Sequence, residues 1–379
     1  MLAVALPACK AAERPVVSDS GSTAPARSTA DKALASGSTR AAPPSGAAPT
    51  PAGSWALLGD ASNGLVAVTE HIQIAPNGTI YGTQFHGDVF RGTASGDRFT
   101  FEKLPGAGLT NNGYSALGVN ARSEPLIGCW AKGHGGNDDQ QLFRFDPGKG
   151  EWIASKGLSP GRYNRGVSAF HLEKDGSILV IGGYSPSVLQ SKDGGDSYAL
   201  IYDFNTANKV SVGSYGHIFS MERSPTGEII AGIEVKGFQR SLDGGVSYSP
   251  LEMPGPPSNT YGVGFTAEGE ALLSRNYNVN PIRIYRRTRD GQLVKADLGL
   301  EGDDFNHRPR GGVYTILLAP WGENFISTFT AIYRSKNGGR WEKFMHGIEG
   351  TASPNAITAD ARCIYAAVKP GAIYRYCGG

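Results

Sequence analysis

SKDGGDSY (191–198) and SLDGGVSY (241–248) are two copies of one pattern, and SKNGGRW (335–341) repeats it with one residue fewer. The pattern is typical of a tight turn between two strands. An Asp side chain accepts hydrogen bonds from nearby backbone N–H groups, and glycine adopts the positive φ that such turns need. The aromatic residue at the end then packs the hairpin onto its sheet. We therefore expect Asp193, Asp243 and Asn337 to be structural residues.

A longer repeat surrounds these turns. It consists of an apolar strand, a turn and a second apolar strand, and its copies lie at 71–83, 115–129, 168–183, 218–233, 261–274, 314–328 and 355–368. A spacing of roughly 40–50 residues is typical of four-stranded propeller blades. No extended stretch shows the period of a helix. The sequence therefore predicts an all-β protein, with a seven-bladed β-propeller over residues 54–379.

The S-x-D-G-G-x-S-Y segments resemble the Asp-boxes of the bacterial neuraminidase repeat, which build propellers of the sialidase-like superfamily. The resemblance implies that each box lies between the third and fourth strands of a blade, on the face away from the ligand pocket. It does not extend to the sialidase catalytic motif. PIRIY (281–285) only shuffles the letters of the F/Y-R-I-P motif, and sialidases have six blades. We therefore do not expect sialidase activity.

The two chain ends are expected to share one blade. AIYRYC (372–377) is the third strand of the last blade, with no fourth strand after it, whereas SWALL (54–58) is a lone strand before the first blade. Pairing them removes open sheet edges. Cys363 and Cys377 are equidistant from residue 370, so they face each other across the final hairpin, and we predict a disulfide between them. The alternative is two buried thiols.

The N-terminal residues indicate a route out of the cytoplasm. MLAVALPAC (1–9) resembles the end of a bacterial lipoprotein signal in which Cys9 is acylated, although Pro7 and the missing charged start depart from that pattern. Residues 10–53 are rich in Ala, Ser, Thr, Pro and Gly and lack aromatic residues. Such a segment cannot offset its ordering entropy, so we expect a disordered tether. We predict a lipid-anchored monomer in the bacterial periplasm or at the cell surface, with the outer membrane favoured.

Charge and hydropathy exclude two classes of function. The chain carries 36 Lys and Arg against 34 Asp and Glu, and a protein that binds nucleic acid through its phosphates needs a basic surface. No apolar run approaches the ~18 residues of a membrane-spanning helix. We expect neither nucleic-acid binding nor an integral membrane protein.

In a propeller, the loops that enter the first strand and join the second strand to the third gather on one face. Ligands usually bind on such loops. Tyr, Asn and Arg in these loops suit a sugar, because rings stack on sugar faces and planar polar groups bind hydroxyls. The alternative is that the Tyr side chains wedge between blades. The candidate ligand-binding residues are Tyr114, His134, Arg165, Tyr184, His217, Glu234, Arg275, Tyr277, His307 and Arg310.

Whether the protein is an enzyme stays open at this point. A glycoside hydrolase needs two carboxylates roughly 5–9.5 Å apart, and a polysaccharide lyase needs a cation and a base such as His or Tyr. No metal-ligand spacing stands out, and no cofactor is expected. A glycan is the preferred ligand. The alternative is a non-catalytic protein-binding propeller, either an envelope assembly scaffold or an immunity lipoprotein that inhibits a toxic effector. Carboxylates available for hydrolysis are Asp138, Asp139, Glu234, Asp303 and Asp304.

Overall fold

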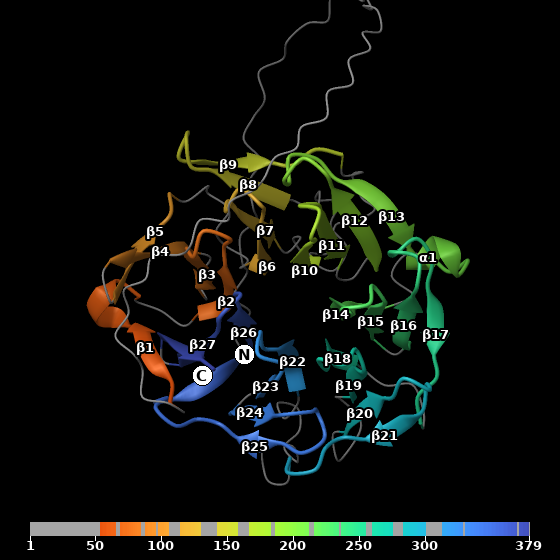
Figure 1. The fold of residues 1–379 in the computed structure, drawn as a ribbon. Coiled ribbons are helices and arrows are strands. Elements are labelled where there is room, and N and C mark those ends of the chain that lie inside the picture. Colours follow the sequence, from red (N-terminus) through yellow and green to blue (C-terminus); the bar gives the residue numbers. More distant parts are fainter. Residues whose placement is uncertain are drawn as a thin grey trace, which may run out of the picture.

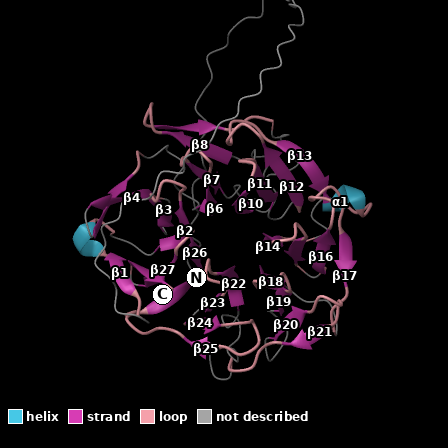
Figure 2. Ribbon diagram, in the orientation of Figure 1, coloured by secondary structure: helices cyan, strands magenta, loops and turns pink. Residues whose placement is uncertain are grey.

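The fold is a closed ring of seven antiparallel four-stranded sheets (Figure 1), in a computed structural model of the chain. The predicted seven-bladed β-propeller is therefore confirmed, and the chain is almost entirely strands and loops (Figure 2). No helix in the described part of the chain is long and apolar enough to cross a membrane. The structure describes residues 54–65, 69–84, 88–95, 98–105, 114–129, 142–157, 167–182, 186–211, 216–234, 236–254, 260–275, 283–300, 313–328, 330–369 and 371–378.

Six blades are each built from four consecutive strands, which run from the axis outward. Blades 1 to 3 contain β2 (Thr69–Ile74), β3 (Ile80–Gln84), β4 (Val89–Ser95) and β5 (Arg98–Lys103); β6 (Tyr114–Val119), β7 (Pro125–Cys129), β8 (Leu142–Asp146) and β9 (Glu151–Ala154); β10 (Val167–Leu172), β11 (Ile178–Gly182), β12 (Ser187–Ser191) and β13 (Ala199–Asp203). Blades 4 to 6 contain β14 (Ile218–Arg223), β15 (Ile229–Ile233), β16 (Gly237–Ser241) and β17 (Ser249–Leu251); β18 (Thr260–Phe265), β19 (Ala271–Arg275), β20 (Arg283–Arg287) and β21 (Leu293–Lys295); β22 (Val313–Leu318), β23 (Asn324–Thr328), β24 (Ile332–Ser335) and β25 (Glu342–Lys343).

Blade 7 is made from both ends of the chain, as predicted. Its inner strands are β26 (Thr351–Ala359), β27 (Cys363–Lys369) and β28 (Ala372–Cys377), and its outermost strand is the N-terminal β1 (Ala56–Gly59). Ala56 pairs with Arg375 and Leu57 with Tyr374. The ring is thus closed by antiparallel pairing, which covers the outer edge of β28 with β1. Two short helical turns, η1 (Ala61–Asn63) and α1 (Phe204–Ala207), follow β1 and β13.

Trp55, just before β1, anchors this closure. Its side chain is only 3% exposed, its ring lies 5.7 Å from that of Tyr376 and 6.0 Å from that of Phe344, and its indole Nε1 donates to the Phe344 carbonyl over 3.1 Å. A buried indole that also satisfies its N–H contributes a large apolar contact at no polar cost.

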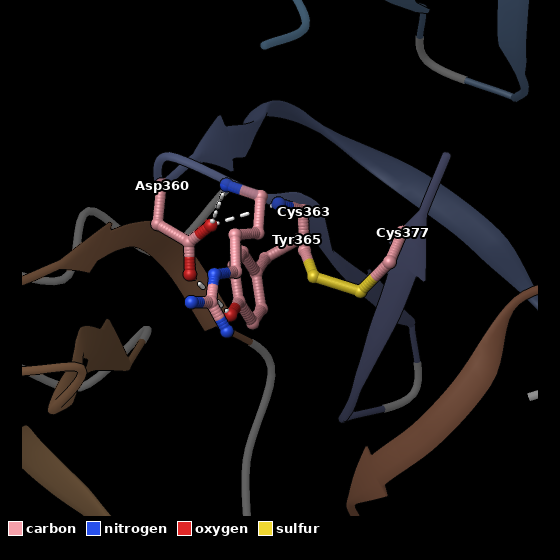
Figure 3. Close-up of a disulfide and its surroundings, with 5 residues drawn as sticks. Asp360, Cys363, Tyr365 and Cys377 are labelled. Carbon is pink, nitrogen blue, oxygen red and sulfur yellow. Dashed lines mark hydrogen bonds between the residues drawn. A yellow bond between two sulfur atoms is a disulfide. The ribbon is translucent and has the colours of Figure 1, made fainter. Parts of the chain in front are cut away.

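The predicted disulfide between Cys363 and Cys377 is confirmed, with 4.1 Å between the two Cα atoms (Figure 3). The two residues are direct cross-strand partners in β27 and β28. Next to the disulfide, the Asp360 carboxylate accepts hydrogen bonds from the Cys363 N–H over 2.8 Å and from the Tyr365 hydroxyl over 2.7 Å. These bonds hold the turn into β27 and with it the position of Cys363.

The two S-x-D-G-G-x-S-Y segments form near-identical turns between the third and fourth strands. In the first, Asp193 Oδ1 accepts from the Ser197 N–H over 2.9 Å and from the Ser191 hydroxyl over 2.7 Å. In the second, Asp243 Oδ1 accepts from Ser247 and Ser241 over 2.9 and 2.8 Å. Asn337 Oδ1 accepts from the Gly339 N–H over 3.1 Å in the shorter copy. The aspartates thus satisfy backbone donors within their own turns.

These turns define the bottom face of the ring, which also carries the turns between first and second strands. Asn120, in such a turn of blade 2, donates from Nδ2 to the Gly194 carbonyl of blade 3 over 2.8 Å. The opposite face, where the first strands begin, is called the top face below. The described strand ends that flank the loops singled out in the sequence for ligand binding lie at the top face.

Candidate functional site

The structure describes the side chains of three of the predicted ligand-binding residues. They are His217 and Glu234 of blade 4 and Arg275 of blade 5. Tyr114 is described as the first residue of β6, without its side chain. The other predicted residues lie outside the described residues, and so do the acidic residues considered for hydrolysis in the same loops: His134, Arg165, Tyr184, Tyr277, His307 and Arg310, with Asp138, Asp139, Asp303 and Asp304.

His217 and Glu234 are in direct contact at the top of blade 4. His217 immediately precedes β14 and Glu234 immediately follows β15, so the antiparallel pairing of these strands places the two residues side by side. His217 Nδ1 lies 3.1 Å from Glu234 Oε2. The backbones are joined as well, since the Glu234 N–H donates to the His217 carbonyl over 2.7 Å. The sequence had assigned both residues to the site but had not predicted this contact.

Gly216 is what permits this close packing. Its φ is +86°, and a Cβ atom at this position would stand 2.7 Å from the Glu234 carbonyl oxygen. A side chain here would displace the backbone that carries the Glu234 carboxylate. Glycine is therefore required both because the backbone has a positive φ and because no room exists for a Cβ atom.

The pair has a defined chemistry. A carboxylate that accepts from imidazole Nδ1 fixes the orientation and the tautomer of the ring. His217 is 8% exposed, and its ring centre lies 5.4 Å from that of Phe219. Blade 4 thus presents, at the inner end of the top face, an oriented polar pair beside an aromatic ring.

Arg275 ends β19 in the neighbouring blade and is 5% exposed. Its Nη1 donates to the Pro254 carbonyl, in the segment that leads into blade 5. This contact gives Arg275 a structural role in holding that segment against the blade. Arg275 pairs with Thr260 at the start of β18, just as Ile233 pairs with Ile218 at the start of β14. Arg275 therefore corresponds to Ile233, the residue before Glu234.

A feature that sequence reasoning missed lies in the first strands. In blades 1 to 6 the register between first and second strands shifts at the same place, one residue after the start of the first strand. Such β-bulges change the direction of the side chains beside them and occur often next to functional sites. The extra residues, which we call the collar, are Glu70, Ser115, Ser168, Phe219, Tyr261 and Tyr314.

The collar surrounds the axis at the top end of the innermost strands, which Figure 1 shows grouped around the centre of the ring. Two of its side chains are described, and both are half-buried. Phe219 packs beside His217, and the Ser168 hydroxyl donates to the Ile218 carbonyl of the next blade. A sequence signal for the collar existed, because each residue occupies the same place in its repeat.

Three titratable side chains of the innermost strands lie below the collar. Burial lowers the pKa of His71 to about 4 and raises the pKa of Glu222 to about 8. Burial, and secondly the charge of Arg223, lowers the pKa of His171 to about 4. At neutral pH all three are therefore predominantly uncharged. His71 Nδ1 lies 2.7 Å from the hydroxyl of Thr83.

Among the described residues, no group of three or more His, Cys, Asp or Glu side chains is placed to hold a metal ion. Of the predicted residues whose side chains are described, His217 and Glu234 are the pair that the structure brings into contact. The described part of the site is thus suited to hydrogen bonding and ring contact.

Comparison with known proteins shows the class of this chain. No protein-family model and no curated protein sequence matches it, whereas solved β-propeller structures match over nearly the whole domain. One is YCF48 bound to D1 peptide, with a TM-score of 0.60 and 14% identity over 88% of this chain and 97% of the other. Another is a catalytically inactive virginiamycin B lyase from Staphylococcus aureus with quinupristin, with a TM-score of 0.58 and 14% identity over 85% and 97%.

The extracellular domain of the putative hybrid two-component system BT4673 from B. thetaiotaomicron also matches. Its TM-score is 0.58, with 12% identity over 85% of this chain and 39% of that one. At these identities the likeness concerns the fold. The chain is a seven-bladed β-propeller similar in architecture to a lyase, to a protein solved with a bound peptide and to the extracellular domain of a putative two-component system, and fold alone does not choose among such functions.

Proposed function

We propose that this protein is an extracytoplasmic, lipid-anchored propeller that binds a glycan on its top face. The observation that carries the proposal is the oriented His217–Glu234 pair beside Phe219, at the inner end of the top face. This combination suits carbohydrate recognition, because sugar hydroxyls need oriented hydrogen-bonding groups and sugar C–H faces pack on aromatic rings. A rigid ring holds these groups in place and lowers the entropic cost of binding.

The compartment is inferred from two separate features. The Cys363–Cys377 disulfide fits an oxidising environment, and LPAC (6–9) supplies the cysteine of a lipid anchor. We expect the wild-type protein in the membrane fraction of its bacterium and the Cys9→Ser variant in the soluble extracytoplasmic fraction. A Cys9→Ser variant that stays in the membrane fraction would contradict the anchor without bearing on the ligand.

The full chain carrying Cys9→Ser is the reagent for testing the ligand. It would be applied to a glycan array and, in parallel, used to capture partners from envelope extracts. Glu234→Gln and His217→Gln each replace one member of the His217–Glu234 pair and should weaken glycan binding about tenfold, which corresponds to one hydrogen bond to a charged group. Leu242→Ser is the matched control, because Leu242 is 69% exposed in a bottom-face turn, and it should bind like the parent.

Protein binding is the second candidate, and one observation favours it. YCF48, whose structure contains a bound D1 peptide, has the same architecture over 88% of this chain. In this alternative the protein is an envelope assembly scaffold or an immunity lipoprotein against a toxic effector. Capture of one envelope protein together with an empty glycan array would overturn the glycan proposal in its favour.

A further inference from the structure

We infer that the turn between β16 and β17 of blade 4, residues 241–248, is a second contact with the membrane, and this inference rests on the lipid anchoring proposed above. The turn exposes two large apolar side chains to solvent. Leu242 is 69% exposed and Val246 64%, more than any other large apolar side chain in the described part of the chain. A Cβ atom at Gly244 would meet nothing within 4 Å, so no neighbouring segment covers this part of the turn.

The fold does not require apolar residues at these two places. The equivalent turns of blades 3 and 6 carry charged residues there, namely Lys192, Asp196, Lys336 and Arg340. The turn of blade 3 nevertheless keeps the same hydrogen bonds around its aspartate as the turn of blade 4. Leu242 and Val246 are therefore not needed for the geometry of the turn, and a neighbouring pair of exposed apolar side chains points to a contact outside the ring.

The bottom end of blade 4 also exposes little charge. Its two bottom turns, 224–228 and 242–247, expose one charged side chain, that of Asp243, whereas the corresponding two turns of blade 3 expose five. The Asp243 carboxylate accepts hydrogen bonds from Ser241 and Ser247 within the turn, which offsets part of the cost of moving it out of bulk water. The two apolar side chains can therefore enter the head-group region of a bilayer, whereas the turns of blade 3 would lose the hydration of several charges.

The N-terminal segment joins the ring at the same face. β1 pairs antiparallel to β28, with Ala56 opposite Arg375, and β28 is a third strand that ends with Cys377 at the bottom face. Trp55, which precedes β1, therefore lies at the bottom end of blade 7. A lipid anchor at Cys9 would thus be connected to the ring on its bottom face.

The two contacts lie on opposite sides of this face. Figure 1 shows β1 of blade 7 and β17 of blade 4 across the ring from each other. A flexible tether alone does not orient a rigid ring. A second contact across the ring holds the bottom face on the bilayer, and the top face with its proposed glycan site then points away from the membrane.

The size of the turn favours a lipid surface over a protein partner. Two exposed side chains fall well short of the roughly 800 Å² that each partner buries in a specific protein interface. Membrane contact needs no such area, because the anchor already holds the protein at the bilayer and the turn only adds to it. Two side chains bind weakly by themselves, so the Cys9→Ser protein should still fractionate as soluble.

The test measures by sedimentation how the full-length Cys9→Ser protein, which carries no acyl chain, partitions onto vesicles of phosphatidylethanolamine and phosphatidylglycerol. Leu242→Ser/Val246→Ser should lower the partition coefficient about tenfold, because neither side chain then favours the bilayer. Leu57→Ser/Leu200→Ser is the matched control, since Leu57 and Leu200 are 51% and 41% exposed in the outermost strands of blades 7 and 3. It should stay within about twofold of the parent.

Hydrogen–deuterium exchange of the acylated wild-type protein on the same vesicles measures the orientation of the ring. The amides of 242–247 should exchange more slowly on the vesicles than in the Cys9→Ser protein in solution. The amides of 236–237, in the top-face loop between β15 and β16 of the same blade, should exchange equally in both.

Equal partition of the parent and the Leu242→Ser/Val246→Ser variant would overturn the inference, and so would slowed exchange at 236–237 in place of 242–247. If the serine pair leaves partition unchanged but abolishes capture of one envelope protein, the turn is a protein contact and the membrane contact is overturned. Failure of the proposed anchor has a separate readout, because the Cys9→Ser protein would then stay in the membrane fraction of the cell. The vesicle assay uses protein without acyl chains and tests the turn in either case.

Discussion

Glu222 carries a carboxyl group into the innermost strand of blade 4, where burial raises its pKa to about 8. A group whose pKa is higher in the folded than in the unfolded state contributes stability below its unfolded pKa. That contribution is lost as the pH rises from about 4.5 through about 8. His71 and His171 behave in the opposite sense, because burial lowers their pKa values to about 4. Their contribution is present above pH 6.5 and is lost as the pH falls towards about 4.

Glu222→Gln tests this at the level of one residue. Glutamine matches the protonated glutamate in shape but cannot ionise, so the variant should equal the wild type in stability near pH 4, below the unfolded pKa of about 4.5. At pH 9 it should be more stable, by roughly 1–3 kcal/mol. Urea unfolding at several pH values measures the difference. A constant difference across this range would contradict a buried, neutral Glu222.

Contacts between residues could be predicted from the sequence where both residues lie in one hairpin. They could not be predicted where the contact depends on the register between strands that are joined by longer loops or belong to different blades. Cys363 and Cys377 could be matched because they share one hairpin. Three ion pairs between a third-strand arginine and a glutamate were not predicted, although the arginines occupy the same register in their blades. The pairs are Arg144–Glu124, Arg240–Glu228 and Arg286–Glu270. Register between strands was needed to see them, and the sequence alone did not provide it. The bulges at the collar appear only in the pairing of the strands, so the equivalent places of these residues in the repeat did not by themselves reveal them.

At the level of elements, the two S-x-D-G-G-x-S-Y turns are alike in themselves but differ in surroundings. A Cβ atom at Gly195 would stand 2.7 Å from Cδ2 of the buried Leu126, whereas one at Gly245 would stand no nearer than 3.3 Å from any atom, the Tyr248 hydroxyl. Both glycines have positive φ, 101° and 98°. The first turn is therefore packed against the neighbouring blade, and the second is open.

Gly195→Ala and Gly245→Ala separate conformation from packing. Both variants bear the strain of an alanine at positive φ, about 1 kcal/mol. Gly195→Ala must also displace Leu126, which should add about 1–3 kcal/mol. Thermal unfolding should therefore rank Gly195→Ala clearly below Gly245→Ala. Equal losses in the two variants would show that the turn itself, and not its contact with blade 2, sets the cost.

Trp55 of the N-terminal segment makes the same kind of contacts in blade 7 as Trp341, the aromatic residue of the last turn, makes in blade 6. Trp341 donates from Nε1 to the Ala296 carbonyl over 2.7 Å and from its N–H to Leu298. Trp55 makes the equivalent bonds to Phe344 and His346. The aromatic position of the last blade is thus supplied from the other end of the chain.

Trp55→Ala and Leu57→Ala compare a buried with an exposed residue of this segment. Trp55 is 3% exposed and Leu57 51%. We expect Trp55→Ala to lower the free energy of unfolding by about 3–5 kcal/mol, and Leu57→Ala to change it by less than about 0.5 kcal/mol. Urea titration of both variants gives the answer. A small effect of Trp55→Ala would mean that the closure does not depend on its anchor.

At the level of the whole molecule, the architecture was accessible from sequence because it is repetitive. Seven similar strand pairs and one unpaired strand at each end leave few arrangements other than a closed ring. The top face was less accessible, because its loops share no repeat. What could be foreseen there were residue types at loop positions, and of these His217 and Glu234 proved to be in contact.

Ring closure also makes a prediction about cooperativity. Trp55 and the Cys363–Cys377 disulfide both hold blade 7 together: Trp55 anchors the outermost strand β1, and the disulfide joins the second and third strands, β27 and β28. Loss of the disulfide in the double variant Cys363→Ser/Cys377→Ser should cost about 3 kcal/mol, from the chain entropy of a loop of this size. If both features stabilise the same blade cooperatively, the triple variant with Trp55→Ala should lose less free energy of unfolding than the sum of the losses in the Trp55→Ala variant and the double cysteine variant. The expected difference is about 1 kcal/mol.

The control for this cycle is Tyr198→Ala, because Tyr198 is buried in a separate apolar cluster in blades 2 and 3. Combined with the disulfide variant, it should give additive losses. Urea unfolding of the full set measures both couplings. Additivity in the Trp55 cycle as well would show that β1 and the β27–β28 hairpin are held independently. The ring would then be closed by two separate contacts rather than by one cooperative blade.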